Sequence, residues 1–291
     1  MIRRTTTLVE TKLPQASPYG LLSPAVEVVR ETSNDWLNGF VYETPDGRVD
    51  VVNQVINGGD VTSKSTVVDG NPQNPTLRAY YPFDIQASVR SSTFGVTIED
   101  VQKAADNALE VVTQKAIETE FWTGAIAKTL TATDHENRYL SHADAFDVTP
   151  IANTPVKVGY GLALLEQAIG NATVGAQGTI HAPLLIASAL PVSDNGGVLT
   201  TKLGSKVVAG SGYSNIGPNG VIAPVDTAWM YATGPVTVRI GKTPVVTPEM
   251  VSEAVKIDNN TVEFYVDRPA AVTWSTSFLY AVLVDLKLDY S

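Results

Sequence analysis

A chain of 291 residues is long enough for about two domains, and its formal net charge of −10 argues against a protein that grips nucleic acid through the phosphate backbone. The absence of cysteine excludes disulfides and cysteine-based zinc sites, and no window holds the roughly 18 apolar residues that a membrane span needs. Because the polar start lacks the apolar core of a signal peptide, we expect a soluble protein that folds in the cytoplasm of the cell that makes it.

The first third of the chain has little periodicity. Residues 1–35 contain three prolines and predict an extended arm with one short helical turn near "SPAVEVVRE". Two strand-like runs around Pro45-Asp46-Gly47, a turn signal, predict a hairpin. Residues 56–78 are polar and rich in glycine and proline, and are either disordered or a projecting loop that finds its partner elsewhere.

A strand and a long helix follow. Alternating apolar and polar residues from Phe83 to Val89 predict a half-buried strand. Thr97 is a suitable N-cap with Asp100 three residues on, and Gly124 stands in the C′ position, which predicts a helix roughly 40 Å long. Its expected buried stripe is Val101, Ala104, Ala105, Ala108, Leu109, Val112, Ala116 and Ile117.

The region from 151 to about 233 has the pattern of a small α/β domain. A second helix is expected to start at Thr154-Pro155 and to run to Gly170. The strand "GTIHA" leads to a short helix beginning at Pro183, and "NGGVLTTKLGSKVVAGSGY" predicts a hairpin-like pair. Three strand-like runs in the last sixty residues are expected to pair with the strand near Phe83 and to pack on the long helix.

Two glycine-rich stretches resemble phosphate-binding loops without completing the pattern. In "KVVAGSGYSNIGPNG", Gly210-Ser211-Gly212 is followed by Asn215 where a dinucleotide fingerprint has its third glycine, so plain turns are favoured over phosphate binding. Gly241-Lys242-Thr243 copies the end of a Walker A loop, but Pro244 stands where the phosphate-binding helix must begin. We interpret it as a strand end.

One loop gathers residues that can ligate a metal: Asp134, His135, Glu136, His142 and Asp144. Adjacent Asp, His and Glu side chains splay apart in most backbones, and no helical i, i+4 pair is present. A solvated loop is therefore favoured over a metal site.

Nucleophilic catalysis lacks its usual signals. The chain has no G-x-S-x-G elbow and no cysteine, and His181 at the end of an apolar strand is expected to be a structural histidine with one hydrogen bond. We therefore predict a protein without catalytic residues, cofactor or metal.

Several short runs, each weak alone, occur in an order that resembles a known family. They are "SPYGLLS", "WLNGFVYE", "ETEFWTG", "GTIHAP", "VVAGSGY", "AWMYATGPVTVRIG" and "AAVTWSTSFLYAVLVDL". Together with the order of predicted elements, they resemble the major capsid proteins of tailed double-stranded DNA bacteriophages, closest to those of siphoviruses of actinobacteria. That resemblance implies an α+β chain with the HK-type capsid fold.

The resemblance also implies a division of the chain. It consists of an N-terminal arm (1–35), a hairpin and extended loop (36–80), a peripheral domain (81–150) with a spine helix (97–123), an axial domain (151–233) and closing strands of the peripheral domain (234–291).

By the same resemblance, the function is structural: copies of the chain assemble into pentamers and hexamers of an icosahedral shell around double-stranded DNA. Other expected partners are a scaffold, a portal and a decoration protein, without sequence-specific DNA binding or a membrane, in a virion assembled in the host cytoplasm. The loop charges Asp60, Lys64, Asp69 and Arg78 are the candidates for intersubunit ion pairs. An encapsulin-type compartment and a nucleotide-binding enzyme remain as alternatives.

Overall fold

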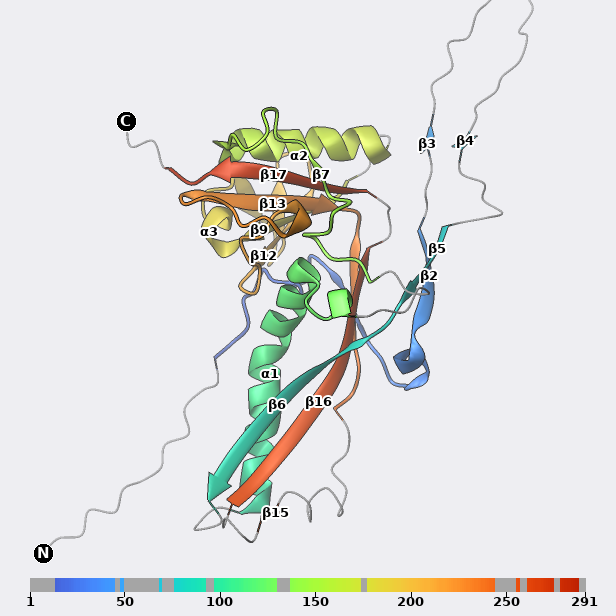
Figure 1. Ribbon diagram of the computed structural model, residues 1–291, viewed down its shortest axis with the longest axis vertical. Coiled ribbons are helices and arrows are strands. Elements are labelled where there is room, and N and C mark those ends of the chain that lie inside the picture. The colour runs from blue at the N-terminus through green and yellow to red at the C-terminus, as the bar shows by residue number, and fades with distance from the viewer. Residues whose placement is uncertain are drawn as a thin grey trace, which may run out of the picture.

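The computed structural model arranges the chain as two sheets around one long helix (Figure 1). One sheet has five strands, the other has eight, and two ladders of two strands each accompany them. The described residues are 14–44, 48–49, 68–69, 76–92, 97–129, 137–173, 177–243, 255–256, 261–274 and 278–287.

Strands from distant parts of the chain form the five-stranded sheet. They are β1 (Glu27–Arg30), β6 (Phe83–Ser92), β14 (Val236–Ile240), β15 (Val255–Lys256) and β16 (Thr261–Trp274). The order is β1-β14-β16-β15, and β6 pairs with β16 in antiparallel register from Phe83 opposite Ala270 to Ser92 opposite Thr261. The predicted meeting of the middle and the end of the chain is thus confirmed for β16.

The long helix α1 (Ile98–Thr123) packs along β6 and β16. At its start, the Thr97 side chain accepts a hydrogen bond from the Asp100 N–H, while the Asp100 carboxylate accepts one from the Thr97 N–H. At its end, Gly124 has a φ of 59° and donates its N–H to the Glu120 carbonyl. Both predicted boundaries of the helix are confirmed.

Eight strands form the second sheet. They are β7 (Phe146–Asp147), β8 (Val156–Lys157), β9 (Thr179–Pro183), β10 (Val192–Asp194), β11 (Leu199–Thr201), β12 (Lys206–Gly210), β13 (Thr227–Thr233) and β17 (Leu279–Asp285). The order is β10-β11-β12-β9-β13-β17-β7, and β8 also pairs with β17. This sheet lies across the upper end of α1 in Figure 1.

Both faces of the eight-stranded sheet are covered. Helices α2 (Val158–Thr173) and α3 (Leu184–Ala187) share one core with Met230 and Val282, whereas Trp229 and Leu283 belong to the core that contains α1. Neighbouring residues of a strand point to opposite faces, so burial on both sides explains why all seven residues of β13 are buried. None of the described helices combines the length and apolar character needed to cross a membrane.

The buried side of α1 departs from the predicted stripe. Ala104 and Val112 are exposed, whereas Gln114 and Glu118 are buried. The upper half of the helix is covered on more than one side, because the N-terminal segment and the loop after β12 also bond to it. An apolar stripe at helical spacing predicts only the side of a helix that packs against a single surface, so it does not identify side chains buried by a second contact.

Two predicted elements are wrong in detail. The second helix begins at Val158 rather than at Thr154-Pro155, because residues 156–157 pair with β17 as β8. The last strand, β17, does not join the strand near Phe83; it pairs along its whole length with β13 in the eight-stranded sheet. The expected domain bounds stay a prediction, but the closing strands divide between the two sheets.

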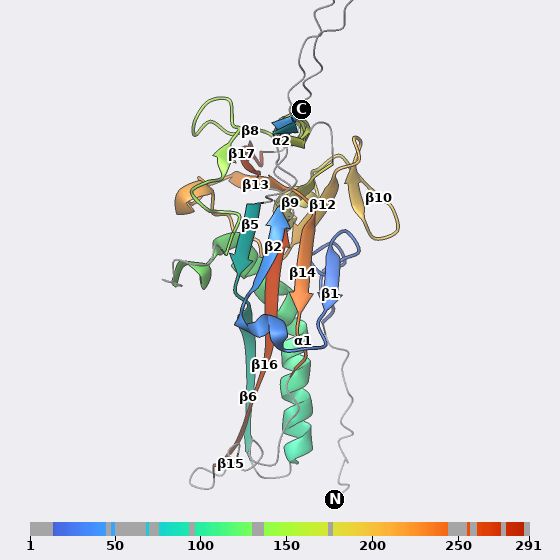
Figure 2. The same ribbon diagram turned by 90° about the vertical axis from the view of Figure 1, so that its right-hand side faces the viewer.

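The predicted hairpin around residues 45–47 is also wrong. Strand β2 (Phe40–Thr44) pairs with β5 (Thr76–Tyr80), and β3 (Arg48–Val49) pairs with β4 (Val68–Asp69). Figure 2 shows the β2–β5 ladder in front of β16, and α1 lies on the other side of that strand. A small core of Trp36, Tyr80 and Ala271 holds its base.

The described part of the N-terminal arm lies on the body of the molecule. Turns occupy residues 18–26, and residues 27–30, expected within a helical turn, form β1 parallel to β14. Leu21 is fully buried in the core that contains α1. The described part of the arm is thus held by β14 and by the core of its own chain.

Gly124→Ala should lower the free energy of unfolding by at least about 1–2 kcal/mol, because an L-residue is strained in the left-handed region. The added Cβ would also lie 2.2 Å from Cδ1 of Tyr139. The matched control is Gly170→Ala within α2, where a Cβ would meet no described atom within 4 Å. The free energy of unfolding of the control should rise by up to roughly 1 kcal/mol. Urea denaturation measures both variants, and equal changes in the two would contradict the argument.

Candidate functional site

The four residues expected at subunit contacts fall before β6. Asp60 and Lys64 lie outside the described residues. Asp69 is in β4, with its backbone opposite Arg48, and Arg78 is in β5, which pairs with β2. Their role in intersubunit ion pairs stays a prediction.

The glycine-rich loop after β12 holds a carboxylate of the same chain. The N–H of Gly212 donates to Oε2 of Glu118 at 2.8 Å, and the hydroxyl of Ser211 donates to that oxygen at 3.3 Å. The N–H of Leu21 and Nε2 of Gln114 donate to the other oxygen, Oε1, at 3.1 and 2.9 Å. The backbone donor that a phosphate would need at Gly212 is therefore occupied.

Two glycines allow this close approach. A Cβ on Gly212 would lie 2.4 Å from the carbonyl oxygen of Lys115, and a Cβ on Gly20 would lie 1.9 Å from Nε2 of Gln114. Neither position has room for a larger residue unless α1 or its side chains move. Gly20 and Gly212 thus allow the N-terminal segment and the loop after β12 to pack closely against α1.

The N-terminal segment connects α1 to the eight-stranded sheet. Nε2 of Gln114 donates to the carbonyl of Ser17 at 3.2 Å, and the carbonyl of Tyr19 accepts from the N–H of Ala209 at 2.7 Å. The hydroxyl of Tyr19 donates to Asp194 at 2.9 Å. We call Glu118, Gln114, residues 17–21 and residues 211–212 the carboxylate junction.

The carboxylate junction excludes water from an ionisable group. Burial raises the pKa of the Glu118 carboxyl, and the hydrogen bonds from Gly212, Leu21, Gln114 and Ser211 oppose that rise. A fully buried carboxylate with four donors is suited to holding segments together.

The second glycine stretch is a strand end, as predicted. β14 ends at Ile240, and the N–H of Gly241 donates to the carbonyl of Pro269 at 2.8 Å. A Cβ on Gly241 would lie 2.5 Å from Cγ of Pro269, so this glycine serves strand packing. Pro244 lies outside the described residues.

Three of the five residues of the candidate metal cluster lie outside the described residues, namely Asp134, His135 and Glu136. Within the described part, Nδ1 of His142 lies 3.3 Å from Oδ2 of Asp144. No three described His, Asp or Glu side chains gather as a metal site would require.

His181 links β9, the loop after β12 and the end of β13. Its Nδ1 lies 3.0 Å from the hydroxyl of Tyr213, and its Nε2 lies 2.9 Å from Oγ1 of Thr233. The hydroxyl of Thr233 donates to the carbonyl of Gly234, so Thr233 accepts from Nε2–H and Nδ1 accepts from Tyr213. The histidine makes two hydrogen bonds rather than the expected one.

The surroundings keep this histidine neutral. Burial lowers the pKa of His181 to about 3. Burial also raises the pKa of Tyr213, and the charge of Glu118 adds to that shift, so the hydroxyl remains a donor. His181 and the carboxylate junction thus meet through the loop that contains Tyr213.

The sequence interpretation missed Gln114 and Glu118. A polar i, i+4 pair on a helix ordinarily marks a solvated face. The glycines at 20 and 212, which make room for these side chains, lie far from them in the sequence. Only the fold brings the four positions together.

Comparison with solved structures finds shell proteins along nearly the whole chain. The capsid of a native GTA particle has a TM-score of 0.54 at 14% identity, covering 98% of this chain and 95% of that chain. The chain has the HK-type shell fold. A protein chain of Mycobacterium phage Adephagia matches at a TM-score of 0.50 and 13% identity, covering 94% of this chain and 91% of that chain.

The same fold occurs in a compartment protein. The holo-SrpI encapsulin complex from Synechococcus elongatus PCC 7942 matches at a TM-score of 0.51 and 8% identity, covering 98% of this chain and 95% of that chain. No family model matches the sequence, and no curated protein matches it. The predicted α+β shell fold is therefore confirmed by structure alone.

Glu118→Gln should lower the free energy of unfolding by about 1–3 kcal/mol, because the new amide nitrogen would point a donor at existing donors. The control is Asp106→Asn, an exposed carboxylate on the same helix, which should change stability by no more than about 0.5 kcal/mol. Urea denaturation of the full chain measures both. Equal stability of the two variants would show that the carboxylate junction contributes nothing.

His181 should make stability depend on pH. Its folded pKa of about 3 lies below its usual 6.5, so its contribution is complete above pH 6.5 and is lost as the pH falls toward 3. Wild-type stability should fall more steeply than that of His181→Gln in this range, by up to about 1.4 kcal/mol per pH unit. Denaturation curves between pH 7 and 4 test this, and parallel pH profiles would refute it.

Proposed function

We propose that the chain is the major capsid protein of a tailed double-stranded DNA bacteriophage and assembles into pentamers and hexamers of an icosahedral shell. The observation that carries this proposal is the fold shared with the GTA capsid over 98% of this chain and 95% of that chain. The likeness to a chain of Mycobacterium phage Adephagia and the phage-like sequence runs support a place among siphoviruses of actinobacteria.

The β2–β5 ladder supports assembly on physical grounds. A two-stranded ladder is marginally stable alone. Its base is covered by Trp36 and Ala271, while Val41 remains 61% exposed. A neighbouring copy that lay against the ladder would supply the missing contacts, and a closed shell repeats such a contact at every subunit.

The charge of the chain suits a container for DNA. A net charge of −10 disfavours tight binding of the phosphate backbone, so packaged DNA would remain free to leave. We place the protein in the virion capsid, assembled in the host cytoplasm with a scaffold, a portal and a decoration protein as further partners. The proposed role needs no sequence-specific DNA binding, membrane, cofactor or metal.

The proposed role is structural and has no catalytic step. The occupied Gly212 donor and the strand end at Gly241 argue against a nucleotide-binding enzyme. The two hydrogen bonds of buried His181 likewise serve packing.

An encapsulin-type compartment is the second candidate, favoured by the similarity to the holo-SrpI encapsulin complex. Particle size and content distinguish the two. A phage shell should be larger and filled with DNA, whereas a compartment encloses protein. Negative-stain microscopy of purified particles, with analysis of their content, decides between them.

Deleting residues 60–75 should leave soluble protein that no longer forms closed shells, because the segment includes three of the positions expected to fix neighbouring copies, Asp60, Lys64 and Asp69. Electron microscopy of wild type and deletion variant makes the comparison. Gly170→Ala, outside this segment, is the control and should assemble normally. Normal shells from the deletion variant would overturn the role of the loop, and absence of shells from wild type would overturn the proposed function.

A further inference from the structure

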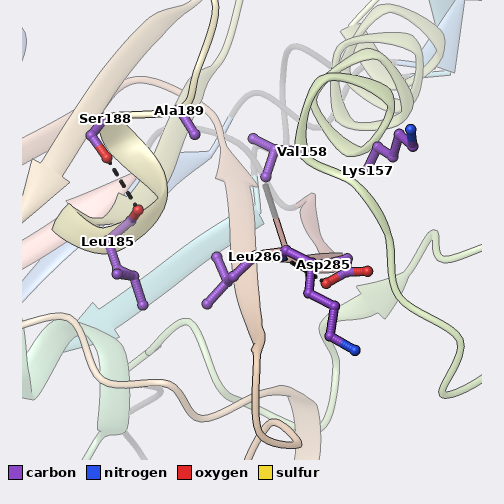
Figure 3. Close-up of a pocket in the computed structure, with 8 residues that line it drawn as sticks. Lys157, Val158, Leu185, Ser188, Ala189, Asp285 and Leu286 are labelled. Atoms are coloured by element: carbon purple, nitrogen blue, oxygen red, sulfur yellow. Dashed lines mark hydrogen bonds between the residues drawn. The ribbon is translucent and has the colours of Figure 1, made fainter. Parts of the chain in front are cut away.

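An open apolar cavity lies at the end of the eight-stranded sheet where β17 finishes. It has a volume of about 380 Å³ and is lined by Leu185 on α3, Ser188 and Ala189 just after α3, Val158 at the start of α2, and Leu286. Figure 3 shows the Leu185 side chain pointing toward Leu286 across this space. Leu185 is 66% exposed, which is unusual for a residue that faces apolar neighbours.

The rim of this cavity is basic. Lys157 and Lys287 border it with one acid, Asp285. Asp285 accepts the backbone N–H of Lys287 at 2.9 Å and keeps its charge, so the two lysines leave the rim with one net positive charge. The cavity therefore suits an apolar group that has acidic neighbours.

Such a group lies at the opposite end of β17. Phe146 stands on the short edge strand β7 and is 66% exposed. Its ring meets Tyr280 edge-on at 6.3 Å, and Tyr280 stacks on Phe278 at 5.5 Å, so its position is held by aromatic contacts. The acids Asp144 and Asp147 flank it, and both are exposed.

The two surfaces of one copy cannot meet each other. Phe146 pairs with Tyr280 at the start of β17, whereas the cavity lies beside Asp285 and Leu286 at its end. At about 3.3 Å per residue, the strand separates them by roughly 20 Å. Phe146 can therefore reach such a cavity only on another copy.

We propose that Phe146 of one copy inserts into the cavity between Leu185 and Leu286 of a second copy. Asp144 and Asp147 then face the lysine-bearing rim. Because the two surfaces differ and lie at opposite ends of one strand, the contact is head-to-tail, and repetition with a constant rotation closes a ring. The inference rests on the proposed function, in which rings of five and six copies are the building units.

The absence of cysteine permits a direct test. In the double variant Ala143→Cys/Ser188→Cys, which places thiols beside the two surfaces and keeps Phe146 and Leu185, a short flexible bis-maleimide should join each copy to the next and produce a ladder of covalent oligomers. Each single variant should give at most dimers. The matched control is Val112→Cys/Ser188→Cys, in which the first thiol lies on the exposed side of α1, and it should give no ladder.

Assembly of the wild-type protein is followed by electron microscopy in parallel. A ladder from Ala143→Cys/Ser188→Cys supports the docking, even if wild type formed no shell and the proposed function failed. Closed wild-type shells without a ladder would overturn the docking and leave the proposed function standing. Neither ladder nor shells would overturn both, and a ladder of equal yield from the control would also overturn the docking.

A functional readout accompanies the cross-linking. Phe146→Ser should abolish shell formation without changing the urea midpoint, because the side chain is mostly exposed in a single copy. Val112→Ser is the matched control for an exposed apolar residue and should still assemble. Normal shells from Phe146→Ser would count against the docking.

Discussion

The buried carboxylate of Glu118 holds together three segments that the sequence keeps far apart. One of its four donors comes from the arm, two come from Ser211 and Gly212 in the loop after β12, and the fourth is the amide of Gln114 on α1 itself. A buried charge is tolerated only where its hydrogen-bonding capacity is filled. The position of the eight-stranded sheet at the upper end of α1 therefore depends on an exact fit of backbone donors around one side chain.

This constraint explains two glycines of the chain, Gly20 and Gly212. The pattern of a strand followed by a glycine-rich loop, as in residues 206–220, also occurs in phosphate-binding sites, because both arrangements need backbone N–H groups that approach an anion closely. Here the anion belongs to α1, and Gly212 lies so near that a Cβ would approach the helix backbone at 2.4 Å. The local chemistry is the same, but the partner is internal.

Local patterns predicted the elements that local interactions determine. Thr97, Asp100 and Gly124 define both ends of α1 because caps act within a few residues. Pairing between distant strands was harder to predict. The pairing of β16 with β6 was predicted correctly, whereas β17 pairs with β13 instead. A strand that is buried on both faces is apolar throughout, so its sequence does not indicate which sheet it joins. The junction at Glu118 could not be predicted from local patterns, because the backbone donors Leu21 and Gly212 are 97 and 94 positions away in the sequence.

The described residues of a single copy leave two apolar surfaces that they do not cover. The cores on either side of the eight-stranded sheet are filled, yet the two ends of β17 present an exposed phenylalanine and an open apolar cavity. Neither the exposed ring of Phe146 nor the open cavity is buried by the described residues. Because they lie at opposite ends of β17, Phe146 cannot fill the cavity of its own copy. The carboxylate junction links the sheet that bears both surfaces to α1, so in the proposed assembly it would also set the angle at which they meet neighbouring copies. A head-to-tail contact closes only at particular rotations, and rings of five and six copies require slightly different ones. The interaction that orders one chain thus bears on the geometry that many chains can share.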